Sequence, residues 1–123
     1  TCLMVDFTGQ VASESIGTRQ YSGTGGQTDT AVGAKEAYDG LGKSIIACRS
    51  TAKKGQQSTI MPTLPEGTSV TLHRSNADHI VTEYGIAHLR GRTVRERTQN
   101  LIAVAHPDFR AELTEQAKEL GYL

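Results

Sequence analysis

A glycine-rich loop is the stretch of the sequence best suited to bind a ligand. Gly23, Gly25 and Gly26 fall within four residues, shortly before a predicted helix. Glycines let the backbone approach a ligand closely, and amides near a helix N-terminus can hold an anion or a developing oxyanion. The alternative, a loop that only needs positive φ angles, stays open on this evidence. The spacing fits neither the Walker A motif nor the dinucleotide-binding fingerprint.

Two adjacent lysines form a second candidate contact. Lys53 and Lys54 come soon after the predicted strand 43–48, and therefore lie near its carboxyl end. Lysine binds phosphate as a point charge, so this pair could meet a phosphate-bearing ligand. A solvated polar loop is the competing interpretation, and spacing alone favours it.

Two glutamates could act as a nucleophile or a general base. Glu14 and Glu83 are both flanked by small or apolar residues. A carboxylate in that setting can form a covalent intermediate, but it can equally be a structural acid held by hydrogen bonds. We expect the structural role for both.

The histidines and serines give little indication of a metal site or of a serine nucleophile. The sequence contains no HExxH pair and no cysteine partner at zinc spacing, so we expect no metal site. It also lacks the nucleophile elbow of a serine hydrolase. The residues concerned are His73, His79, His88, His106, Ser22 and Ser50.

Composition narrows the class of protein. The chain has 123 residues, enough for one domain, and its 13 basic and 13 acidic side chains give no net charge. We therefore expect neither nucleic acid nor an anionic membrane surface as a partner. No apolar run approaches the length of a membrane span. Cys2 and Cys48 show no disulfide-scaffold spacing, which favours free thiols in the cytoplasm.

Hydrophobic patterning predicts the elements that would position these residues. Strands are expected at 2–7, 43–48, 69–72 and 79–83, with a weaker one at 11–16. Helices are expected at 29–38 and through the remainder after 83, with a capping box at Thr93 and Glu96, a break at Pro107 and a C-cap at Gly121. Strand, glycine loop, helix and strand follow one another. This order predicts an α/β domain with a mainly parallel sheet flanked by helices.

Several motifs, taken in order along the chain, carry a family resemblance. They are Gly23–Asp29, Lys43–Ile46, Ser50–Lys53, Val81–Ile86, Leu89–Gly91 and Ala105–Arg110. Together they closely resemble the C-terminal domain of the acetyl-CoA hydrolase/transferase family, with the 4-hydroxybutyrate and butyryl-type CoA-transferases as the nearest variety. The resemblance runs from about Cys2 to the C-terminus.

The resemblance implies a fold, a reaction and partners. Residues 1–123 would form one domain of the CoA-transferase type, and an N-terminal CoA-transferase domain would complete the enzyme. Substrates would be an acyl-CoA and a small carboxylate, with no cofactor beyond the CoA thioester and a homodimer as an open expectation. The family's glutamate nucleophile lies in an upstream motif that this sequence lacks, so we assign no catalytic residue here.

The resemblance also assigns binding residues one by one. Gly25, Gly26 and Gln27 match the loop that binds CoA and the thioester, Tyr21 lies at its lip, and Lys53 matches a lysine that approaches CoA.

The sequence departs from the family pattern at two positions. Thr30 replaces a usual aromatic residue, and His88 replaces a usual acidic one. Thr30 puts the identity of the acyl group in doubt. Two further functions remain open, an acyl-CoA hydrolase and a non-catalytic CoA-binding module. The chain begins with Thr1 rather than Met, so we expect it to be part of a longer protein.

Overall fold

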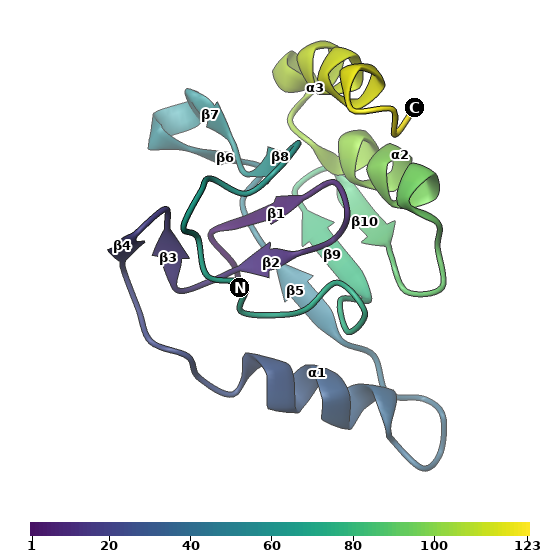
Figure 1. Ribbon diagram of the computed structural model, residues 1–123. Coiled ribbons are helices and arrows are strands. Elements are labelled where there is room, and N and C mark those ends of the chain that lie inside the picture. Colours follow the sequence, from purple (N-terminus) through teal and green to yellow (C-terminus); the bar gives the residue numbers. More distant parts are fainter.

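Two three-stranded sheets and two C-terminal helices enclose one core in the computed structural model, which describes residues 1–123 (Figure 1). The first sheet has the order β2 (Val11–Ala12), β1 (Met4–Asp6) and β8 (Ile60–Met61). The second has the order β10 (Gly85–His88), β9 (His79–Thr82) and β5 (Ile45–Ala47). No helix has the length and apolar character that crossing a bilayer requires.

Both sheets are mixed. In each, one pair is parallel (β1 with β8, β5 with β9) and one is antiparallel (β1 with β2, β9 with β10). The predicted α/β class is confirmed, but the prediction of a mainly parallel sheet is wrong. Tight turns cause the difference, because a two-residue turn between Thr82 and Gly85 folds the chain back onto β9.

Two small hairpins lie outside the main sheets. The first joins β3 (Ser15–Ile16) to β4 (Arg19–Gln20). The second joins β6 (Thr51–Ala52) to β7 (Gln57–Ser58) through a short 3₁₀ turn, η1 (Lys53–Gly55). Two of the predicted binding residues lie on these hairpins. Tyr21 directly follows β4, and Lys53 begins the turn between β6 and β7.

Three α-helices complete the fold. In the view of Figure 1, α1 (Gln27–Lys35) lies on the side of the molecule away from α2 (Val94–Val104) and α3 (Pro107–Glu119). The capping box is present, since Thr93 Oγ1 accepts from the Glu96 amide at 3.2 Å and the Glu96 carboxylate accepts from the Thr93 amide at 2.8 Å. Gly121, at φ +72°, lies just after α3 and donates to the Lys118 carbonyl.

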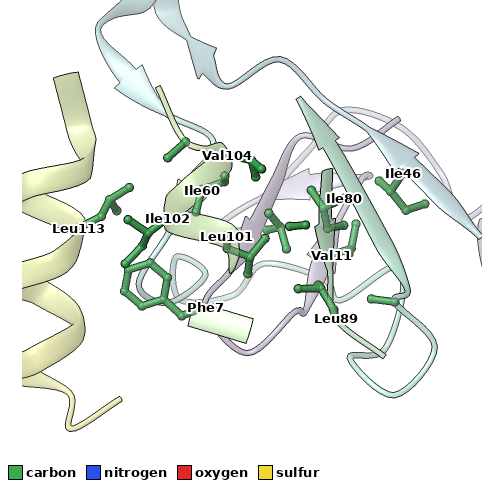
Figure 2. Packing of buried hydrophobic residues seen from close by; sticks show 14 of the residues in the cluster. Phe7, Val11, Ile46, Ile60, Ile80, Leu89, Leu101, Ile102, Val104 and Leu113 are labelled. Atoms are coloured by element: carbon green, nitrogen blue, oxygen red, sulfur yellow. The ribbon is translucent and has the colours of Figure 1, made fainter. Parts of the chain in front are cut away.

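The core joins the two sheets to α2 (Figure 2). Side chains from the first sheet, from β9 and from α2 converge there and are shielded from water. Representative members are Val5, Ile60, Ile80, Leu101 and Val104. This core holds β5 and β9 in place, and the candidate site lies beyond the carboxyl ends of those two strands.

Candidate functional site at the carboxyl ends of β5 and β9

A cavity of about 580 Å³ opens where β5 and β9 end. Its walls include Cys48 and Arg49 after β5, Thr82 and Glu83 at the end of β9, and the N-terminal residues of the chain. Because β5 and β9 are parallel, their carboxyl ends meet at one edge. Ligands of α/β proteins bind at such edges.

A second hollow, of about 260 Å³, adjoins the first. Tyr21 and Lys53 both line it, although they are far apart in the sequence. Leu3, Ala52 and Thr59 line both hollows, so the two share part of their walls. The structure therefore brings Tyr21 and Lys53 together beside the larger cavity.

Lys53 and Lys54 have an unusual backbone. Their φ angles are +49° and +57°, in the left-handed region that non-glycine residues seldom occupy. Such conformations cluster at functional sites. Of the two lysines, only Lys53 lines the hollow. The structure therefore distinguishes Lys53 from Lys54, which their spacing in the sequence could not do.

Glu14 holds the start of the glycine loop. Its carboxylate accepts a hydrogen bond from Thr24 Oγ1 at 2.6 Å, and its carbonyl accepts from the amides of Tyr21 and Ser22 at 2.8 and 3.0 Å. The side chain is buried. Glu14 is thus engaged in positioning the loop, as expected of a structural acid.

Gln27 holds the other end of the loop. Its amide group donates to the Thr1 carbonyl at 2.8 Å and accepts from Ser13 Oγ at 2.9 Å. One residue further on, Thr28 Oγ1 donates to the Thr71 carbonyl at 2.8 Å. The side chain of Gln27 therefore anchors α1.

Gly25 and Gly26 lie in open space at the N-terminus of α1. A Cβ atom built at either position would meet no atom within 4 Å, and neither has a positive φ. Gly26 is the N-cap residue of α1, and no side chain caps the helix there. The first-turn amides are therefore available to a ligand. Gly25, Gly26 and Gln27 line neither hollow.

Glu83 is an ionised carboxylate at the mouth of the larger cavity. Hydrogen bonds from its own backbone amide and from that of Ser50 keep the pKa of Glu83 below its usual value. The Ser50 N–H donates to Oε2 at 2.8 Å. This carboxylate fixes the segment after β5, which agrees with the structural role expected for it.

The two cysteines are free thiols and line the same cavity. They lie within hydrogen-bonding reach of each other, and this contact with Cys48 raises the pKa of Cys2. Both thiols are half-buried.

One cluster escaped the sequence analysis. Asp78, His79 and His88 bring their side-chain donor atoms within 4.8 Å of one another. The zinc-spacing rule missed it because strand pairing, rather than a short sequence interval, places His88 opposite His79. The pairing of β9 with β10 was itself not predicted.

A comparison with protein families identifies the domain. The model of the acetyl-CoA hydrolase/transferase C-terminal domain matches residues 1–117. The chain belongs to this family. Among curated members it is 52% identical to the succinyl-CoA:cyclohexane-1-carboxylate CoA transferase of Geobacter metallireducens and 50% identical to the 4-hydroxybutyrate coenzyme A transferase of Clostridium kluyveri. Each alignment covers 97% of the chain and 27% of the relative.

Solved structures share the fold of the chain. RipA from Yersinia pestis matches 99% of the chain with a TM-score of 0.88 and 43% identity, over 27% of its own length. The chain thus spans about a quarter of the relatives it matches. The family resemblance noted in the sequence is confirmed.

Proposed function

We propose that the full-length protein is a CoA-transferase that moves CoA from an acyl-CoA to a small carboxylate of the 4-hydroxybutyrate, butyrate or acetate type. This chain supplies the half of the site that binds CoA and the thioester. The transferase names of the two curated relatives that are half identical to the chain support this assignment.

The observation that carries the proposal is the surface formed by the two adjoining hollows. CoA is an extended molecule with a thioester at one end and phosphates towards the other. The lining of the surface is suited to such a ligand, with Lys53 and Tyr21 on the smaller hollow and a largely apolar wall on the larger one. Lys53 would contact a phosphate of CoA as a point charge.

The glycine loop would act on the thioester. The free first-turn amides after Gly26 can donate to a carbonyl oxygen that gains negative charge during attack. The bare glycines leave room for the substrate, because no other part of the chain occupies the space beside them. Tyr21 would stand at the lip of the loop.

The reaction would proceed by covalent catalysis. A glutamate carboxylate attacks the acyl-CoA thioester, which releases the CoA thiolate and leaves an acyl-glutamyl anhydride. The thiolate then attacks the glutamyl carbonyl, which releases the free acid and forms a glutamyl-CoA thioester. The acceptor carboxylate then attacks the glutamyl-CoA thioester, which releases the CoA thiolate and leaves a new mixed anhydride. The thiolate finally attacks the acceptor's carbonyl in that anhydride, which forms the new acyl-CoA and frees the glutamate carboxylate.

The nucleophile would come from the rest of the protein. The Glu14 carboxylate accepts from the Thr24 hydroxyl, and the Glu83 carboxylate accepts from the Ser50 amide, which supports leaving both out of the covalent chemistry. An N-terminal CoA-transferase domain would supply the glutamate across the site. The reaction would need no cofactor besides the CoA thioester. The two free thiols support a cytoplasmic location.

The test is an assay of the full-length protein with butyryl-CoA or acetyl-CoA and a panel of small carboxylates. The proposal expects a new acyl-CoA that contains the added acid. Release of free CoA without a new thioester would indicate a hydrolase. Absence of either product would support a binding module and overturn the proposal.

A further inference from the structure

A cluster of three potential metal ligands lies on the β9–β10 hairpin. His79 and His88 are directly paired across the two strands, and their rings stack with centroids 4.8 Å apart at an angle of 10°. Asp78 precedes β9 and is buried. One of its carboxylate oxygens lies 3.3 Å from Nδ1 of His79, and the other lies 3.1 Å from Nε2 of His88.

We propose that Asp78, His79 and His88 bind a divalent transition-metal ion of the zinc class. Two ligand atoms bound to Zn²⁺ at about 2.0–2.2 Å in tetrahedral geometry lie about 3.3–3.6 Å apart. The two nitrogen-to-oxygen separations are already close to that value, and all three donor atoms lie within 4.8 Å of one another. The two rings lie in nearly parallel planes, and Nδ1 of His79 also lies 3.3 Å from the Ser44 carbonyl oxygen, so both rings must turn before their lone pairs converge on one ion.

The backbone beneath the three side chains is fixed by hydrogen bonds. The amide of His79 donates to the Ser44 carbonyl at 3.1 Å, and the amide of Leu89 donates to the Asp78 carbonyl at 2.7 Å. The carbonyl of His88 accepts from Asn100 Nδ2 at 2.9 Å. Because the backbone is fixed, metal binding would have to order only the side-chain torsions, which favours affinity.

Solvent can reach the cluster. It borders a hollow of about 420 Å³ that no hydrophobic residue lines, and the His88 side chain is 45% exposed. A metal held by three protein ligands would keep a fourth position for water at this opening.

Neighbouring charges restrict which metal can bind. Lys43 and Arg90 line the same hollow and oppose a dication. Binding must therefore come from coordination by the imidazole nitrogens rather than from net charge. Imidazole suits Zn²⁺, Co²⁺, Ni²⁺ and Cu²⁺, whereas Mg²⁺ and Ca²⁺ prefer several oxygen ligands. The proposed site should therefore bind Zn²⁺ and similar transition-metal ions but not Mg²⁺ or Ca²⁺.

The metal site is separate from the proposed CoA site. His79 begins β9, whereas Thr82 and Glu83 at the opposite end of that strand line the large cavity. A bound ion would join β9 to β10 and stabilise the hairpin without touching the acyl group. Binding of a ligand to the folded state alone raises the melting temperature.

The test uses the full-length protein after treatment with EDTA and removal of the chelator. Calorimetric titration with ZnCl₂ should give one ion for each chain, and MgCl₂ should give no binding. His88→Ala and Asp78→Asn should each weaken Zn²⁺ binding at least about tenfold, because each removes one of three ligands. Added Zn²⁺ should raise the melting temperature of the wild type but not of these variants.

His73→Ala is the matched control, because His73 is exposed and its ring bonds only to Ser75. This variant should bind Zn²⁺ as the wild type does. No Zn²⁺ binding by the wild type, or equal binding by His88→Ala, would overturn the proposal and leave a hydrogen-bonded triad. Neither readout depends on CoA transfer, so a failure here is distinguishable from a failure of the proposed function.

Discussion

The carboxylate of Glu14 accepts a hydrogen bond from the Thr24 hydroxyl at 2.6 Å and thereby ties the β2–β3 segment to the glycine loop. The same residue holds Tyr21 and Ser22 through its carbonyl. The loop therefore owes its position to one buried acid and to Gln27 at its far end. This positioning role of Glu14 differs from that of a nucleophile, and substitutions of Glu14 can distinguish the two roles.

Glu14→Gln should keep most of the transferase activity. The amide oxygen of glutamine can still accept from Thr24, although loss of the charge-assisted bond should lower the free energy of unfolding by about 1 kcal/mol. Glu14→Ala should lower both the melting temperature and the activity. A nucleophilic glutamate would behave differently, since its replacement by glutamine would abolish turnover in a protein of near-normal stability. Kinetics and melting curves of the two variants decide the matter.

Gly26→Val should lower kcat by about 10²–10³ while the protein stays folded. A Cβ atom at this position meets no atom of this chain within 4 Å, so a large loss of kcat in a folded variant would point to the substrate and the amides beside it. Gly33→Ala is the control, because Gly33 is equally open and lies within α1. It should leave kcat unchanged and stabilise the helix slightly. Equal losses of melting temperature and activity in Gly26→Val would refute the thioester role.

The 123-residue chain by itself should show no CoA transfer. The carboxylates of its two candidate glutamates are engaged by the Thr24 hydroxyl and the Ser50 amide, and the sequence lacks the upstream nucleophile motif that the family resemblance implies. The assay compares the purified chain with the full-length protein under identical substrate concentrations. Turnover by the chain at a comparable rate would mean that Glu14 or Glu83 is the nucleophile after all.

The capping box of α2 should make stability depend on pH. Hydrogen bonds from the amide and hydroxyl of Thr93 keep the pKa of Glu96 below its usual value. The ionised carboxylate therefore stabilises the folded state above the unfolded pKa, and this contribution is lost as the pH falls through the folded pKa. The melting temperature of wild type should exceed that of Glu96→Gln at about pH 6, and the gap should shrink towards about pH 4. A difference in melting temperature that does not change with pH would contradict the role assigned to the Glu96 carboxylate.

Local chemistry made the C-terminal helices predictable. Thr93 with Glu96, Pro107 and Gly121 are end signals that act within a few residues, and each occupies its expected place in the structure. The start of α1 was predicted two residues late, at Asp29 instead of Gln27, because no capping side chain marks it.

The β10 strand could not be predicted in this way. Gly85–His88 was expected to be helical, yet it pairs with β9, and Ile86 remains 67% exposed. An exposed apolar residue gives no alternation signal, so only the partner strand defines the element. Likewise the expected strand at 69–72 is not formed, and Leu72 makes a single bridge to Val11.

The CoA-binding roles assigned to the glycine loop, Tyr21 and Lys53 stay predictions, whereas the arrangement of these residues could not be predicted. The structure places Tyr21 and Lys53 on one hollow. Their meeting depends on two hairpins that pack only in the folded chain. The pairing of His79 with His88 likewise depends on the folded β9–β10 hairpin, so it could not be predicted from the sequence.

The affinity of the full-length protein for acyl-CoA tests most directly whether this chain binds CoA. Lys53→Ala should raise KM for acyl-CoA about two- to fivefold at low salt, with kcat nearly unchanged, because an exposed charge contact is similar in ground and transition states. The effect should fade with added salt. Lys54→Ala should change neither value, since Lys54 has the same backbone conformation but does not line the hollow. An unchanged KM in Lys53→Ala at low salt, or equal shifts in both variants, would contradict the CoA-binding role.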